Sequence, residues 1–409
     1  MTAPLPVSVI VASRGRPDAL ALCLRALRQQ DHPRFEVIVV ADPAGIAVTE
    51  ATPVKRVRFD EANISVARNL GIAAAAGEVV AFIDDDAVAE PTWLTRLTAP
   101  FADPEVAASG GFVRGRNGIS YQWKARLADR WGEHEPLAVD EAKPSLHAGE
   151  PGRAVRTEGT NCAFRRDVLA EIGGFDPAYR FYLDDTDLDM RLAAAGHLTA
   201  IVPGAQVVHG FAASERRRSD RVPLTLHEIG ASSAVFWRRH AAGLDTTTTM
   251  RRLRDEQRGR ALRHMVSGGI EPDEVGKLMA TLEAGLAEGG RRVLTRLEPI
   301  PAGTEPFLPF RARAGQARVL AGRIWQARRL RAAAAAAAAR GEIVTLILLS
   351  PDARPHRVRF RPEGFWEQAG GIFGPADRRE PRFRLWTFSA RVRHEAIRTA
   401  VCRPFHQIG

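Results

Sequence analysis

The stretch Gly77-Glu78-Val79-Val80-Ala81-Phe82-Ile83-Asp84-Asp85-Asp86 joins five consecutive apolar residues to three consecutive carboxylates. The apolar run over residues 79–83 is typical of a strand that is buried on both faces of a parallel sheet. In open α/β sheets, ligands bind just outside the carboxyl ends of the strands, which is where Asp84, Asp85 and Asp86 fall. Adjacent carboxylates repel one another unless a cation compensates them, and their oxygens suit Mg²⁺ or Mn²⁺ carrying substrate phosphates. The stretch therefore predicts a metal site and chemistry on a diphosphate.

The residues before this stretch alternate between strand and helix patterns. Apolar runs predict strands near 7–11, 35–40 and 54–59, and the spacing of apolar residues predicts helices over 20–27 and 65–76. Alternating units of this kind predict an α/β fold with a parallel, doubly wound sheet. The stretch 114–156 is less regular, and we expect a loop that either covers a site or packs onto the domain.

The character of the chain changes after residue 240, where arginine-rich helical sequence begins. An alanine run occupies residues 332–339, and strand patterns follow at 342–350, 358–360 and 383–388. We therefore expect three parts: a first domain over 1–240, a helical connector over 241–340, and a small β-containing tail domain over 341–409.

A second group of carboxylates, Asp184-Asp185-Thr186-Asp187, begins a predicted helix that Gly196 ends. Carboxylates at a helix start also complement the helix dipole, so the group by itself has a structural explanation. Two acidic groups at the ends of predicted elements nevertheless indicate a site.

Charge and cysteine content limit the partners and the compartment. The net charge of +10 comes from the rear part of the chain, which predicts contact with an anionic partner or reflects a general preference for arginine.

The three widely spaced cysteines favour free thiols, and the first residues lack a signal-peptide pattern, so we expect a cytoplasmic protein. No apolar stretch approaches the roughly 20 residues of a membrane-spanning helix. Residues 314–330, together with Arg311 and Arg313, read as a basic amphipathic helix, which would either lie on anionic lipid at the inner face of the membrane or pack on the first domain.

Several fragments in this order and spacing resemble the family 2 glycosyltransferases of the GT-A fold, over about residues 6–240. These enzymes use a divalent metal to move a sugar from a nucleoside diphosphate to an acceptor hydroxyl with inversion. The fragments that carry the resemblance are residues 7–11, 35–40, 65–71 (Ser-Val-Ala-Arg-Asn-Leu-Gly), 77–86, 173–176 (Gly-Gly-Phe-Asp) and 184–188.

The resemblance implies a donor site. The family's D-x-D motif falls on Asp84, Asp85 and Asp86, with Asp84 at the nucleotide ribose and Asp86 on Mn²⁺ or Mg²⁺. His209 matches a histidine that completes the metal site in many relatives. The residues expected to bind the donor are Asp84 and Asp85 of this motif together with Ala12, Ser13, Asp42 and Arg68. The usual motifs are replaced by Ala12-Ser13-Arg14-Gly15-Arg16 and Ala41-Asp42-Pro43-Ala44, which leaves the base open and gives Arg14 a possible reach to phosphates.

The resemblance also implies the acceptor side. Asp185 matches the general base, which takes the proton of the acceptor hydroxyl as that oxygen attacks the sugar. Asp184 and Asn161 match residues near the acceptor, a saccharide or a lipid-linked sugar of polysaccharide synthesis.

Two other classes of function stay open. A nucleotidyltransferase would also use paired carboxylates and a metal, but it would normally show a glycine-rich phosphate loop, and the first strand is followed only by Gly15. A non-catalytic basic protein would bind nucleic acid or membrane through the rear part. Nucleic-acid binding would require aromatic stacking platforms, and we expect none here because the aromatic residues of the rear part have core-like settings.

Overall fold

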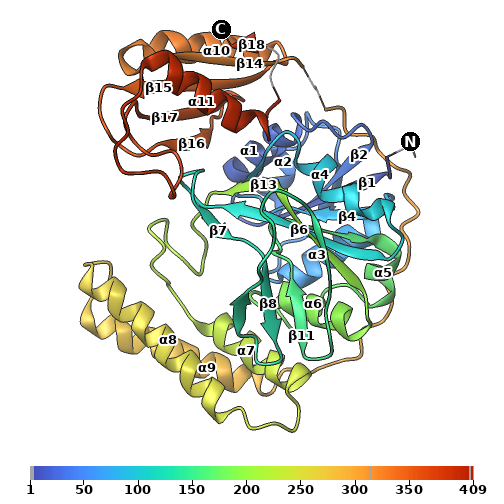
Figure 1. Ribbon diagram of the computed structural model, residues 1–409. Coiled ribbons are helices and arrows are strands. Elements are labelled where there is room, and N and C mark those ends of the chain that lie inside the picture. Colours follow the sequence, from blue (N-terminus) through green and yellow to red (C-terminus); the bar gives the residue numbers. More distant parts are fainter. Residues whose placement is uncertain (1–3, 313–314, 405–406, 409) are drawn as a thin grey trace.

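The computed structural model describes residues 4–312, 315–404 and 407–408. The chain forms an α/β part, a helical part and a second, smaller sheet, which lie in this order along the sequence (Figure 1). The predicted α/β fold, followed by helices and a small β-containing region, is thereby confirmed.

The first half of the main sheet is parallel, as the alternation predicts. Its strands are β1 (Val7–Ser13), β2 (Phe35–Ala41), β3 (Lys55–Arg58) and β4 (Val79–Phe82), in the spatial order β4-β1-β2-β3. Val7 lies beside both Phe35 and Val79, so the three strands begin in register; β1 and β2 end side by side, and β4 ends at Phe82 beside Ile10. The connecting helices are α1 (Pro17–Leu27), α2 (Pro43–Ala47) and α3 (Ile64–Ala74).

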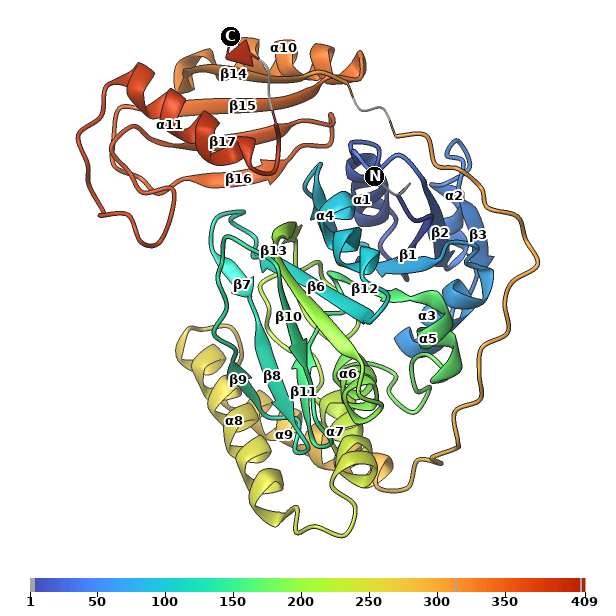
Figure 2. The same cartoon turned by 45° about the vertical axis from the view of Figure 1, so that its right-hand side comes forward.

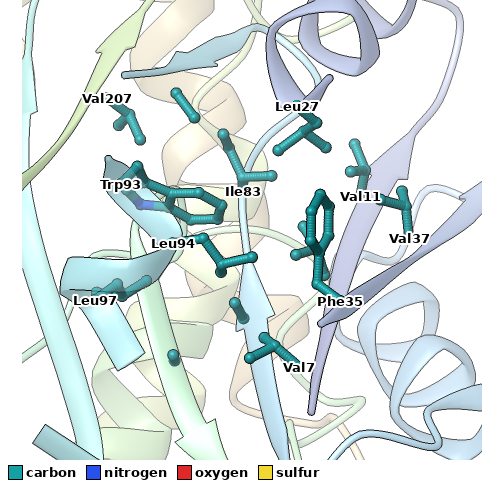
Figure 3. Close-up of a cluster of buried hydrophobic side chains, with 14 of the residues drawn as sticks. Val7, Val11, Leu27, Phe35, Val37, Ile83, Trp93, Leu94, Leu97 and Val207 are labelled. Atoms are coloured by element: carbon teal, nitrogen blue, oxygen red, sulfur yellow. The ribbon is translucent and has the colours of Figure 1, made fainter. Parts of the chain in front are cut away.

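One face of this half packs into an apolar core (Figure 3). Val7, Val11 and Phe35 contribute from the strands and Leu27 from α1, while Trp93 and Leu94 come from α4 (Trp93–Thr98). Trp93 is fully buried, and its Nε1 donates a hydrogen bond to Asn161. The core fixes the strand ends that carry the candidate site.

The other half of the sheet is mixed, which the parallel expectation did not include. β12 (Cys162–Arg165) runs antiparallel between β4 and β6 (Val106–Arg114), and β6 pairs in parallel with the long β13 (Leu198–His209). Three short strands complete this half: β5 (Ala87–Ala89), β7 (Tyr121–Trp123) and β10 (Ser145–Ala148). The covering helices are α5 (Arg166–Glu171) and α6 (Asp184–Ala194), and η1 (Ala99–Ala102) follows α4.

The stretch 114–156 contains five short strands where the sequence predicts a loop. It forms β7 and β10 of the main sheet and a separate small sheet of β8 (Arg126–Asp129), β9 (His134–Pro136) and β11 (Arg153–Arg156). Each of these strands is only three or four residues long. Strands this short are stabilised by pairing with strands elsewhere in the chain, so the local pattern of apolar residues does not predict them.

The helical part consists of α7 (His227–His240), α8 (Thr247–Val266) and α9 (Pro272–Gly289). An extended segment then runs back along the α/β part, where the Ile300 N–H donates to Ala170 O and the Phe310 N–H to Phe35 O. Figure 2 shows this segment on the side opposite α8.

The smaller sheet has the order β16-β17-β15-β14-β18. Its strands are β14 (Ala317–Arg323), β15 (Ile343–Ser350), β16 (Arg357–Phe360), β17 (Trp366–Gly371) and β18 (Gln407–Ile408). The helices are α10 (Ala327–Ala339), with η2 (Ile324–Gln326) before it, and α11 (Phe388–Ala400). β14, β15 and β17 are parallel neighbours, so this is a second α/β unit.

Two predictions for the rear part are wrong. The basic helix expected over 314–330 is β14, η2 and the start of α10, while Arg313 and Ala314 lie outside the described residues. The strand expected over 383–388 is an irregular segment that ends where α11 begins. The boundary expected at residue 341 falls between α10 and β15, inside the smaller sheet unit. Among the described residues, no helix combines the length and the apolar character needed to cross a lipid bilayer.

Candidate active site

A cavity of about 730 Å³ lies at the carboxyl ends of β1, β2 and β4. Its walls also include the starts of α3 and α6, the end of β13, residues from β7 and β8, and the loop that connects β13 to α7. This is the edge at which open α/β sheets bind ligands, because the loops that follow the strands converge there.

A possible metal site lies on this edge. Asp84 and Asp86 follow β4, and His209 ends β13; one ligand atom of each lies within 4.8 Å of those of the other two. His209 Nε2 is 3.2 Å from Asp86 Oδ1 and 4.0 Å from Asp84 Oδ2. Two carboxylates and an imidazole suit a first-row divalent ion such as Mn²⁺, so the residues present fit the predicted metal.

Neighbouring groups keep Asp86 ionised. Burial alone would raise its pKa, but the contacts with His209 and Arg16 and the N–H of Ala212, at 2.7 Å, hold the pKa well below its usual range. The Asp86 backbone carbonyl also accepts the Gly210 N–H at 2.7 Å, which ties the end of β13 to the acidic turn. This hydrogen bond holds the end of β13 next to the turn after β4, so His209 stays close to Asp84 and Asp86.

The middle carboxylate of the triplet points elsewhere. Asp85 is fully buried and is not among the residues that line the cavity. It accepts a hydrogen bond from Ser13 Oγ at 2.7 Å and pairs with Arg16 at 2.7 Å. Burial raises its pKa to about 7 although Arg16 and Ser13 oppose this. The donor contact expected of Asp85 is thus replaced by a supporting position beneath Ser13.

The end of the cavity at β1 and β2 is lined by Ala12, Ser13 and Asp42. The two Asp42 carboxylate oxygens accept the N–H groups of Gly15, at 3.0 Å, and Gly45, at 2.9 Å. This carboxylate therefore shapes both loops of the predicted nucleotide site. Arg14 pairs with Asp60 and Glu215 at the exposed rim.

Arg68 connects the two acidic groups. It extends from α3 over the ring of Phe175, with 5.0 Å between the guanidinium carbon and the ring centre. The guanidinium is hydrogen bonded to Asp184, lies 3.5 Å from Asp84, and donates to Gly159 O at 3.1 Å. Sequence had grouped these residues by resemblance, and the structure brings them together.

Asp184 and Asp185 both line the cavity from the start of α6, but their surroundings differ. Asp185 accepts the N–H of Gly159 at 3.1 Å and lies 3.4 Å from the Arg156 guanidinium. Burial favours its neutral form, yet Arg156 and Gly159 outweigh burial and lower its pKa. For Asp184, burial and the charge of Asp185 raise the pKa despite Arg68. Asp185 is therefore the more firmly ionised member of the pair.

The backbone before this pair is unusual. Tyr182 and Leu183 have φ values of 73° and 63°, a region that side chains other than glycine rarely adopt. Both residues line the cavity. Such strain is found where the surrounding structure holds functional groups in place, and here it precedes Asp184 and Asp185 directly.

Asn161 is placed in the core rather than at the acceptor. It is fully buried, accepts from Trp93 Nε1 at 2.7 Å, and donates to the carbonyls of Phe112 and Ala205. Asn161 is not one of the described residues that line the cavity. The nearby Gly159 and Thr160 do line it.

Several lining residues were missed by sequence reasoning. Arg16 pairs with the acidic triplet, Arg156 contacts Asp185, and Arg217 and Arg260 come from the loop after β13 and from α8. Arg217 Nε is buried without a hydrogen-bond partner in the described structure. Arginines are so frequent in this chain that no local pattern distinguishes these four from the rest.

Comparison with known proteins places the chain in a family. Residues 4–224 match the family described as Glycosyltransferase like family 2. The chain belongs to this family, because the match covers more than half of it.

Individual relatives are more distant. The O-antigen biosynthesis protein RfbC of Myxococcus xanthus is 27% identical over 58% of this chain and 19% of that protein. Glucosyl-dolichyl phosphate glucuronosyltransferase of Haloferax volcanii is 35% identical over 42% of this chain and 56% of that protein. The chain thus spans about half or less of the length of these two relatives. Among solved structures, the mannosyltransferase PcManGT from Pyrobaculum calidifontis, in complex with GDP-Man and Mn²⁺, is 18% identical, with a TM-score of 0.42 over 70% of this chain and 88% of that chain.

Proposed function

We propose that this protein transfers a sugar from a nucleoside-diphosphate donor to an acceptor hydroxyl with inversion. The observation that carries the proposal is that the group of Asp84, Asp86 and His209 and the carboxylate of Asp185 line one cavity. Family membership supports the class of reaction.

The donor would lie along the carboxyl ends of β1, β2 and β4. Ala12, Ser13, Asp42 and Arg68 surround the nucleotide, and Asp84, Asp86 and His209 would hold Mn²⁺ or Mg²⁺. Such an ion supplies charge stabilisation for the leaving diphosphate without proton transfer. Arg217, whose Nε lacks a protein partner, extends the positive charge around the diphosphate.

Asp185 acts as the general base in this proposal. The acceptor oxygen forms a bond to the anomeric carbon, its proton passes to the Asp185 carboxylate, and the electron pair of the broken bond leaves with the diphosphate. Arg156 and the Gly159 N–H keep Asp185 ionised, which is the form that accepts a proton. Asp184 holds Arg68 in place between the donor and acceptor ends.

For the acceptor we propose a saccharide or a lipid-linked sugar of polysaccharide synthesis. The names of two relatives, an O-antigen biosynthesis protein and an enzyme named for glucosyl-dolichyl phosphate, support this class. The three cysteines are buried and unpaired, which supports the reducing cytoplasm as the compartment.

Calorimetric binding of UDP, GDP, TDP and CDP tests the donor site. We expect one nucleotide to bind in the presence of Mn²⁺ and to lose affinity when EDTA removes the ion. Asp86→Ala should weaken this metal-dependent binding, whereas Asp60→Asn at the exposed rim should leave it unchanged. If none of the four nucleotides bound in a metal-dependent way, the donor site would be assigned wrongly. A nucleotidyltransferase would instead bind a nucleoside triphosphate more tightly than any of these diphosphates.

A further inference from the structure

The ends of β14, β15 and β17 meet at one edge of the smaller sheet, because these strands are parallel neighbours. In Figures 1 and 2 this edge lies at the far end of the unit from the segment that connects it to the rest of the chain. The loops that leave the edge are η2 after β14, residues 351–356 after β15, and residues 372–387 after β17.

Large apolar side chains are exposed on two of these loops. The exposed fractions are 68% for Trp325, 56% for Phe383 and 77% for Leu385. Burying apolar side chains stabilises a protein, so the exposure of three large ones on loops of the same sheet edge points to a partner that covers them.

The surrounding structure holds these loops in a defined shape. The Arg384 N–H donates to Phe373 O at 3.1 Å, and the rings of Phe383 and Phe373 are 5.5 Å apart. The Arg323 guanidinium lies 4.4 Å from the Phe388 ring centre and 5.8 Å from that of Trp325, which connects η2 to the start of α11. The apolar side chains are therefore presented together by one folded edge.

Positive charge surrounds these side chains. Arg382 and Arg384 alternate with Phe383 and Leu385, and neither arginine has a carboxylate partner among the ion pairs of the described residues. Arg328 and Arg329 are exposed just after Trp325. Over residues 317–404, arginines outnumber carboxylates by more than two to one. A partner for this edge should therefore be both anionic and able to take up hydrocarbon.

We infer that the edge formed by Trp325, Phe383, Leu385 and the flanking arginines is a docking surface for the anionic lipid headgroups of a membrane. Interfacial proteins bind in this way: aromatic and aliphatic side chains enter the headgroup boundary, and basic side chains attract anionic lipid. A nucleic acid is a poorer occupant, because Leu385, the most exposed of the three, offers neither a stacking face nor a hydrogen bond.

The position of the edge is consistent with this use. In both views the turn between α8 and α9 projects toward the same side of the molecule, and there Val266 is 83% exposed. The inference does not depend on the proposed sugar transfer, since it rests on a surface outside the cavity.

Co-sedimentation of the full chain with lipid vesicles tests the inference. We expect binding to vesicles that contain phosphatidylglycerol, weak binding to vesicles of phosphatidylcholine alone, and a decrease in binding with added salt. The double variant Phe383→Ser with Leu385→Ser should lower the binding constant at least tenfold. Val293→Ser removes a side chain of 80% exposure far from this edge and should leave binding unchanged.

Thermal unfolding of each variant shows whether the fold is kept. If a second pair, Arg382→Ser with Arg384→Ser, folds normally and still binds anionic vesicles as tightly as the unmodified chain, the inference is wrong. It is also overturned if the chain ignores vesicles but binds a single-stranded oligonucleotide and loses that binding in the Phe383 and Leu385 variant.

Discussion

At the scale of single residues, neighbours in sequence have different tasks because the turn after β4, closed by the hydrogen bond from the Ala87 N–H to Asp84 O, directs successive side chains to different sides. Asp84 and Asp86 face the cavity, while Asp85 lies beneath it against Ser13 and Arg16. In the second acidic group, Asp185 contacts Arg156 and Asp184 contacts Arg68. Arginines compensate the crowded carboxylates: Arg16 lies against Asp85 and Asp86, and Arg68 lies against Asp84 and Asp184.

The base assignment predicts the effect of Asp185→Asn. This change removes the proton acceptor and keeps the shape, so turnover should fall on the order of 10²–10⁴-fold while nucleotide affinity with Mn²⁺ changes little. Single-turnover transfer and calorimetry measure the two quantities. Asp60→Asn, which also alters a cavity carboxylate paired with an arginine, should retain full turnover. Unchanged turnover in Asp185→Asn would move the base to another residue.

At the scale of elements, the packing of helices depends on where small residues fall. α7 and α9 touch through their backbones: a Cβ added at Gly285 would lie 1.9 Å from His227 O, and one at Gly289 would lie 2.1 Å from Ala231 O. Gly230 makes the same kind of contact from α7, at 2.4 Å from Leu282 O. These glycines bring α7 and α9 close together within the helical part, from which α8 supplies Arg260 to the cavity wall.

This packing predicts that Gly285→Ala is destabilising by about 1–3 kcal/mol, because the added methyl group has to push the helices apart. Gly276→Ala on the same helix meets nothing within 4 Å and should instead stabilise the protein by up to about 1 kcal/mol through helix propensity. Denaturant unfolding of the two variants measures the difference. Equal effects from both changes would show that α7 and α9 do not pack as described.

The element that sequence reasoning misread is β14. Leu320, Ile324 and Leu330 have helical spacing, but residues 317–323 pair in parallel with β15. β14 and β15 are separated in sequence by the alanine-rich α10, so their pairing is a contact between distant residues. This pairing overrides the weak local preference of residues 317–323 for a helix.

At the scale of the whole molecule, the smaller sheet unit is seated on the α/β part through buried polar contacts. Arg403 and Glu90 pair at 2.8 Å, and both side chains are about 5% exposed. The Arg403 guanidinium also lies 4.4 Å from the Trp366 ring centre, and Trp366 Nε1 donates to Gln29 Oε1 at 3.2 Å. Around them Ala26, Val88, Ile119, Val208 and Val358 form a shared apolar cluster.

Arg403→Met should therefore weaken the contact between the two parts. The change leaves Glu90 buried without its partner, a loss that costs about 3–5 kcal/mol in other proteins. We expect calorimetric unfolding to separate into two transitions and amide exchange to rise in β17. Arg393→Met, at an exposed position on α11, serves as the control and should unfold like the unmodified chain. A single unshifted transition in Arg403→Met would contradict this account.

The sequence by itself determined the α/β class, the parallel direction of the first strands and the two acidic groups, because these follow from local runs of apolar residues and from motif spacing. Only the tertiary structure decided which carboxylates face the cavity, that Asn161 belongs to the core, and that His209 joins Asp84 and Asp86. It also decided that β14 belongs to the smaller sheet and where exposed apolar residues gather. These outcomes depend on side-chain direction and on contacts between residues far apart in the chain, which local patterns do not contain.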